Sequence, residues 1–165
     1  MKFNRFVIRF AMSLGLLAGG GALIHAQESA PAATTNTARI YFAGGKGGEP
    51  DQNTCSFEVK AGEYKFNGGT NNDCTNDDMY WYRIDNAPSA ALITLHAEDD
   101  CRKGGDWYFT IRTYINPVTV GWQKISDLQY LKAGDIVTRG LMYEEGHYEE
   151  GSGVGGKISC VTIDY

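Results

Sequence analysis

The sequence has few histidines, and none of them belongs to a catalytic or metal-binding motif. Only three occur, and His96 and His147 are the two that lie beyond residue 26. No serine or cysteine nucleophile has an evident general base, so the residue pattern of a hydrolase is missing. No Cys-x-x-Cys pair occurs, so the usual first half of a structural zinc site is missing. We therefore expect a protein that is not an enzyme.

Long apolar runs are also missing, apart from one near the N-terminus. Residues 10–24 carry no charge, three basic residues precede them, and a small residue, Ala26, follows. This run of 15 residues is short for a membrane span, which needs about 20. The layout is typical of a secretory signal peptide. We therefore expect residues 1–26 to be a signal peptide and the protein to be exported, to the periplasm or the extracellular space. No membrane span is expected after its removal.

Positive charge is scarce in the rest of the chain. Of the 15 Lys and Arg, three precede residue 27, whereas all 20 Asp and Glu follow it, which leaves a net charge of −8. The phosphates of nucleic acids and of membrane surfaces would repel such a chain, so the charge favours a basic protein partner. Residues 27–38 are small and polar and are expected to form a flexible leader. Residues 39–165 are long enough for one folded domain, which we expect to be a monomer.

Four cysteines lie in the expected domain, namely Cys55, Cys74, Cys101 and Cys160. An even number of cysteines in an exported chain indicates two disulfides. Each bridge would stabilise the fold by roughly 2–4 kcal/mol, because it restricts the unfolded chain. The sequence leaves three pairings open. Cys55 and Cys74 flank the first expected hairpin region, which favours Cys55–Cys74 and Cys101–Cys160.

Short stretches of β-branched and aromatic residues alternate with turns rich in Gly, Asn and Asp. This pattern predicts an all-β sandwich, and no segment has the periodicity of a long amphipathic helix. The expected strands are residues 39–42, 55–59, 79–84, 90–96, 107–115 and 157–163, with short extended pieces near 64 and at 136–137 and 141–143. One helical turn is expected at 125–131. Residues 67–76 and the glycine- and acid-rich residues 144–156 are expected to be loops.

Two segments of the sequence share the same order of residue types. Residues 76–84 (NDDMYWYRI) and 155–163 (GGKISCVTI) both begin with two turn residues and two spacers and continue into an alternating strand. The upstream turn at residues 61–64 (AGEY) also matches a glycine–acid–tyrosine turn. These features resemble the repeated motif of the βγ-crystallins over about residues 39–165. The resemblance implies a Greek-key β-sandwich built from two related motifs.

The same resemblance implies calcium, the usual ligand of this family. Calcium needs several oxygen ligands, supplied there by two such loops. The first loop here keeps Asn76 and Asp77 but has aromatic residues where hydroxyl residues belong. The second keeps Ser159 but has glycines where acids or amides belong. Asn76, Asp77 and Ser159 are therefore the candidate ligands, and we expect calcium to bind weakly or not at all.

The acidic segment, residues 143–150 (YEEGHYEE), is the most distinctive feature of the expected surface, because four of its residues are glutamates. Its candidate binding residues are Glu144, Glu145, His147, Glu149 and Glu150. One interpretation is a solvated acidic loop. The other is a protruding loop that enters a basic cleft on a partner, where complementary charge mainly raises the association rate. In both interpretations the charges are not needed for folding.

Aromatic residues gather in the strands at residues 80–82 and 107–108 and again at Trp122. Alternation predicts that about half of them are core and half are exposed, and an exposed row could stack on sugars or bind a protein. His96, at the end of an apolar strand, is expected to be structural. The leading interpretation is an exported, non-enzymatic binding protein, an inhibitor or neutraliser of a secreted enzyme or toxin. The alternatives are a carbohydrate- or envelope-binding module and a calcium-stabilised structural protein.

Overall fold

A computed structural model describes residues 36–66 and 72–165 of the chain. The expected signal peptide, residues 27–35 of the expected leader and residues 67–71 of the expected loop lie outside this part. The last leader residues are already tied to the fold, because the Val59 amide donates to the Ala38 carbonyl at 2.9 Å.

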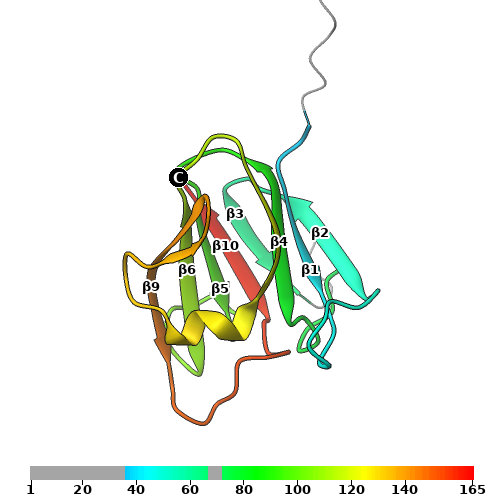
Figure 1. Cartoon of the computed structure of the whole chain (residues 1–165). Coiled ribbons are helices and arrows are strands. Elements are labelled where there is room, and N and C mark those ends of the chain that lie inside the picture. Colours follow the sequence, from blue (N-terminus) through cyan, green and yellow to red (C-terminus); the bar gives the residue numbers. More distant parts are fainter. Residues whose placement is uncertain (1–35, 67–71) are drawn as a thin grey trace, which may run out of the picture. The chain divides into compact units, whose positions relative to one another are not determined.

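Ten strands and one short 3-10 helix make up the regular structure of the described residues (Figure 1). The first five strands are β1 (Arg39–Ala43), β2 (Thr54–Glu58), β3 (Gly62–Lys65), β4 (Trp81–Ala87) and β5 (Leu92–His96). They are followed by β6 (Trp107–Thr113), β7 (Val118–Lys124), η1 (Ile125–Tyr130), β8 (Ile136–Thr138), β9 (Leu141–Tyr148) and β10 (Cys160–Asp164).

The strands form two antiparallel sheets, as expected for an all-β sandwich. A four-stranded sheet has the order β2-β1-β4-β7, and a six-stranded sheet has the order β3-β10-β5-β6-β9-β8. The chain passes between the sheets several times, so strands far apart in sequence become neighbours; β10, for example, pairs with β3 and β5. The Greek-key path and the relation to βγ-crystallins stay predictions.

The core lies between the two sheets and is built by the alternation of side chains along each strand. In β4, Tyr82 and Ile84 are fully buried, whereas Trp81 and Arg83 on the opposite face are half-buried. In the six-stranded sheet, alternate residues of β5, β6 and β10 are buried in the same way, for example Ile93 and Leu95 of β5. Each such side chain stabilises the fold by about 1.5–3 kcal/mol when fully buried. The polar alternate residues are left on the outer faces, where the candidate sites lie.

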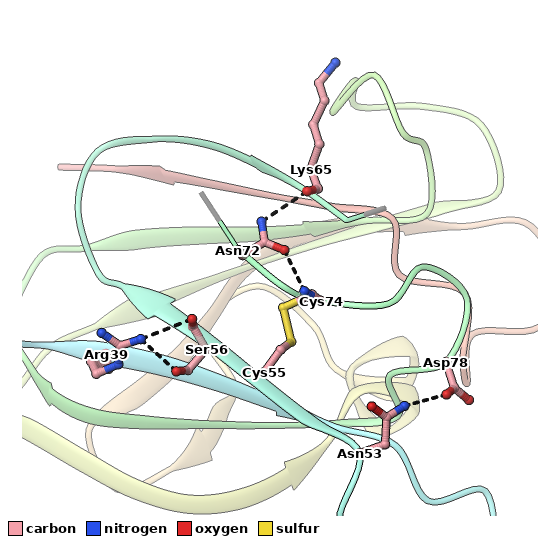
Figure 2. Close-up of a disulfide and its surroundings, with 8 residues drawn as sticks. All are labelled: Arg39, Asn53, Cys55, Ser56, Lys65, Asn72, Cys74 and Asp78. Carbon is pink, nitrogen blue, oxygen red and sulfur yellow. Dashed lines mark hydrogen bonds between the residues drawn. A yellow bond between two sulfur atoms is a disulfide. The ribbon is translucent and has the colours of Figure 1, made fainter. Parts of the chain in front are cut away.

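Both expected disulfides are present with the favoured pairing, Cys55–Cys74 and Cys101–Cys160. The first joins β2 to the segment that leads into β4 (Figure 2). Beside it, the Asn72 side chain accepts from the Cys74 amide at 3.0 Å and donates to the Lys65 carbonyl at 3.1 Å. These contacts attach this segment to both sheets, because β2 and β3 belong to different ones.

Two parts of the sequence-based assignment are wrong. The sequence predicted no strand at β7, where Val118 and Val120 alternate inward but Gly121 interrupts the apolar pattern. The acidic segment was predicted to be a loop, whereas residues 144–148 belong to β9 and pair with β6. The last strand is also shorter than predicted, since pairing starts at Cys160. The predicted helical turn is confirmed as η1.

Candidate functional site

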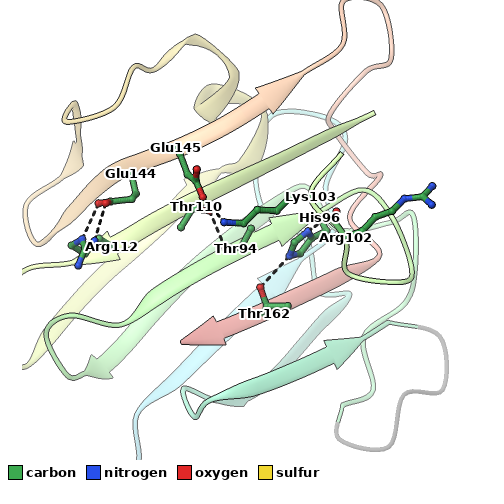
Figure 3. A network of polar contacts seen from close by, with 9 residues as sticks. All are labelled: Thr94, His96, Arg102, Lys103, Thr110, Arg112, Glu144, Glu145 and Thr162. Atoms are coloured by element: carbon green, nitrogen blue, oxygen red, sulfur yellow. Dashed lines mark hydrogen bonds and ion pairs between the residues drawn. The ribbon is translucent and has the colours of Figure 1, made fainter. Parts of the chain in front are cut away.

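The loop of residues 97–106, between β5 and β6, is fastened at one end of the six-stranded sheet. The Cys101–Cys160 disulfide links the loop to β10. The His96 ring adds a second link, because its Nδ1–H donates to the Arg102 carbonyl at 3.1 Å (Figure 3). The loop is therefore held at a fixed position relative to the strands, although it has no regular secondary structure of its own.

His96 is structural, as its position in the sequence suggested. The side chain is 0% exposed, and its Nε2 lies 3.1 Å from the Thr162 hydroxyl. Burial lowers the pKa of His96, so the ring is neutral near neutral pH. Because Nδ1 faces a carbonyl, it carries the proton, and Nε2 accepts from Thr162. Both nitrogens are thus used in holding the loop to β10.

A row of polar side chains continues across the outer face of the six-stranded sheet (Figure 3). The hydroxyls of Thr94 and Thr110 lie 2.9 Å apart on neighbouring strands and are almost fully buried. Beyond them, Lys103 of the loop forms an ion pair with Glu145 of β9. A pocket of about 320 Å³ is lined by both threonines, by Lys103 and by Glu145. The loop and β9 are therefore also joined by charge.

Half of the acidic segment is neutralised within the protein. Glu144 accepts two hydrogen bonds from Arg112 of β6, both 2.8 Å long. These bonds lower the pKa of Glu144, so the carboxylate stays ionised to a lower pH than an ordinary glutamate does. Since Glu145 is paired with Lys103, these two charges take part in strand and loop contacts. The expectation that the charges of the segment are not needed for folding stays a prediction.

Gly146 lies inside β9, where the packing of the neighbouring strand leaves no room for a side chain. Its backbone is opposite Phe109 in β6, next to a bulge at Thr110 and Ile111. A Cβ atom there would lie 2.0 Å from the Tyr143 hydroxyl oxygen and 2.8 Å from both Phe109 Cδ1 and the Tyr108 carbonyl oxygen. Glycine is required for close approach of the two strands and not for a flexible turn. The sequence does not separate these two uses of glycine.

The remaining acidic residues, Glu149 and Glu150, follow β9 and are exposed. The Glu149 amide donates to the Asp106 carbonyl at 2.8 Å, which places this turn beside the 97–106 loop. The chain then returns to β10 at the lower end of the sheets in Figure 1. Neither carboxylate forms an ion pair with another residue in the described ranges.

Carboxylates from three segments meet at this end, which we call the acidic end. Its members are Asp77, Glu98, Asp99, Asp100, Asp106, Glu145, Glu149 and Glu150. Three cations accompany them: Arg102 pairs with Glu98 and Asp100, Lys103 with Glu145, and Lys157 with Asp106. The carboxylates outnumber these cations, so the acidic end carries net negative charge. The sequence showed the run of acids at 98–100 but not that it lies beside the acidic segment, since that depends on strand order.

The three candidate calcium ligands lie together at the acidic end. Asn76, Asp77 and Ser159 line one pocket of about 500 Å³ with Asp106 and Lys157. The two motif loops meet because the Asp77 amide donates to the Ile158 carbonyl at 3.4 Å. The Lys157 ammonium lies 3.3 Å from Asp106 Oδ2 and supplies a positive charge inside the pocket. Among the described residues, no group of three or more His, Cys, Asp or Glu could hold a metal ion. Weak or absent calcium binding stays a prediction.

The aromatic residues divide between core and surface. Tyr82 and Trp107 are fully buried, while Trp81, Tyr108 and Trp122 are half-buried on outer faces. Within the ranges that the structure describes, no helix is long and apolar enough to cross a membrane. Comparisons of the chain with protein-family models, with curated proteins and with solved structures find no match.

Proposed function

We propose that this is an exported, non-enzymatic binding protein whose acidic end receives a basic protein, and that it inhibits or neutralises a secreted enzyme or toxin. The observation that carries the proposal is the position of Glu149 and Glu150. Both are exposed and without an ion pair among the described residues, and they stand beside the acids of the 97–106 loop. A basic partner would supply the cations that the acidic end lacks.

The rigidity of the acidic end supports this role. The 97–106 loop is fixed by the Cys101–Cys160 disulfide, and the turn after β9 is fixed by hydrogen bonds to Asp106. A surface that is already ordered loses little conformational entropy when a partner binds. Unpaired carboxylates at the rim of such a surface would steer a basic partner and raise the association rate more than the final affinity.

The experiment that tests the proposal is affinity capture with residues 27–165 as bait, applied to the medium into which the protein is exported. The test variant is Glu149→Gln/Glu150→Gln. The control variant, Glu58→Gln/Glu63→Gln, removes the same charge from a pocket between β2 and β3. The proposal expects one basic protein that binds the wild type and the control in a 1:1 complex, is released by salt, and binds the test variant less well.

Inhibition is then measured directly on the captured protein. If that protein is an enzyme, its activity should fall in proportion to the amount of wild type added, up to one equivalent. A captured partner that binds the test variant and the wild type equally would show that the acidic end is not the binding surface.

A further inference from the structure

The outer face of the four-stranded sheet carries a second group of side chains, none of which belongs to the acidic end. Tyr41 of β1 is opposite Arg83 of β4, and β7, which bears Trp122, is the next strand. The guanidinium carbon of Arg83 lies 3.9 Å from the centre of the Tyr41 ring and 5.3 Å from that of Trp122. Arg83 is thus held between two half-buried aromatic rings, in cation–π contact with both.

The guanidinium of Arg83 has no acceptor among the described residues. The arginines at 39, 102 and 112 all donate to oxygen atoms of the protein. Arg83 forms neither a hydrogen bond nor an ion pair of this kind, although it is half-buried and has five N–H donors. One row along, the ammonium of Lys124 lies 5.9 Å from the centre of the Trp81 ring and also has no carboxylate partner in the described part.

Contact with two rings restrains the Arg83 guanidinium and leaves its N–H groups for an acceptor outside the protein. A carboxylate or a sulfate matches the edge of a guanidinium with two parallel hydrogen bonds. The half-buried rings of Trp81 and Trp122 beside these cations offer flat apolar surfaces, against which the ring carbons of a sugar can pack. We propose that this face binds an acidic polysaccharide, with Arg83 and Lys124 on its anionic groups and the tryptophans under its sugar rings.

The charge of the protein favours a sparsely charged polymer over a nucleic acid. The chain beyond residue 26 has a net charge of −8, which repels the dense phosphates of DNA or RNA. On this face Arg39 is opposite Glu58 on one side and Asp85 on the other, so it adds no net attraction. Arg83 and Lys124 suit a polymer with no more than one anion on each sugar ring. This inference is independent of the proposed protein partner, which uses other residues.

The test measures binding to two polymers that differ only in charge. Polygalacturonate and its methyl ester have the same sugar rings, but the ester lacks the carboxylates. Titration of tryptophan fluorescence should show binding of polygalacturonate and at least tenfold weaker binding of the ester. Sparsely sulfated dextran against dextran repeats the comparison with sulfate as the anion; the proposal requires that at least one of the two charged polymers bind.

Variants locate the site. Arg83→Gln should weaken binding at least tenfold, and Lys124→Gln, at the edge strand, should weaken it several-fold without disturbing the core. Arg139→Gln removes an equal charge from an exposed position outside this face and should bind like the wild type. If Arg83→Gln proves unfolded by circular dichroism, Lys124→Gln decides alone. Equal binding by wild type and Lys124→Gln, equal binding of ester and acid, or tighter binding of a poly-dT oligonucleotide would overturn the proposal.

Discussion

Replacing Gly146 by alanine is the sharpest test of the strand that the acidic segment forms. If the segment were a loop, the substitution would be harmless. In β9 the new Cβ would lie 2.0 Å from the Tyr143 hydroxyl oxygen and 2.8 Å from the Tyr108 carbonyl oxygen. The tyrosine side chain can shift, but the carbonyl belongs to the neighbouring strand and cannot move without disturbing the pairing with β6.

The expected loss of stability follows from two opposing effects. Overpacking in a well-packed region costs about 1–3 kcal/mol. Alanine also restricts the unfolded chain more than glycine does, which returns about 0.4–1 kcal/mol. We expect a net decrease in the free energy of unfolding of roughly 1–2 kcal/mol, or a Tm lower by about 4–8 °C for a domain of this size.

The assay is thermal and urea denaturation followed by circular dichroism, with the disulfides intact. Gly121→Ala is the matched control, because Gly121 also lies inside a strand, β7, but nothing lies within 4 Å of its would-be Cβ atom. The control should be neutral or slightly stabilising. If Gly146→Ala is as stable as Gly121→Ala, the close packing of β9 on β6 is refuted.

Three further predictions concern a histidine, a disulfide and calcium. The burial-lowered pKa of His96 means that the unfolded chain takes up the proton first, so stability should fall as pH drops from about 6.5 towards 5; His96→Gln should remove this slope in pH-dependent urea melts. Cys101→Ser/Cys160→Ser opens a loop with a sequence separation of 59 and should cost about 4 kcal/mol, measured by denaturation; a loss below that of the other disulfide would contradict the chain-entropy reasoning. Millimolar calcium should barely change the Tm, and a clear rise that Asp77→Ala abolishes would show a functional site.

Local patterns in the sequence were enough to predict the fold class and most strands. Alternation in segments such as residues 107–113 reports directly which face is buried, so these strands and the all-β class could be read from the chain. The favoured disulfide pairing is the one present, but the expected hairpin between Cys55 and Cys74 is not, because β2 and β3 belong to different sheets. β7 was missed because Gly121 and the preceding proline resemble turn signals, whereas pairing with β4 determines its structure.

The candidate site could be predicted only in part, because its contacts are long-range. The sequence identified the acidic segment, yet the partners of Glu144 and Glu145 come from β6 and the 97–106 loop. The sequence spacing of Arg112 and Glu144 does not predict their bidentate ion pair, because the register between β6 and β9 brings them together. The stack of Arg83 on Tyr41 likewise depends on the pairing of β1 with β4.

The most direct test of the account is the association rate constant between the captured basic partner and this protein, measured as a function of ionic strength. The account predicts that Glu149→Gln/Glu150→Gln associates more slowly than the wild type at low salt and shows a flatter salt dependence. The Glu58→Gln/Glu63→Gln control should keep the wild-type rate and slope. Equal rates and equal salt dependence in the wild type and the Glu149/Glu150 variant would contradict a binding role for the acidic end.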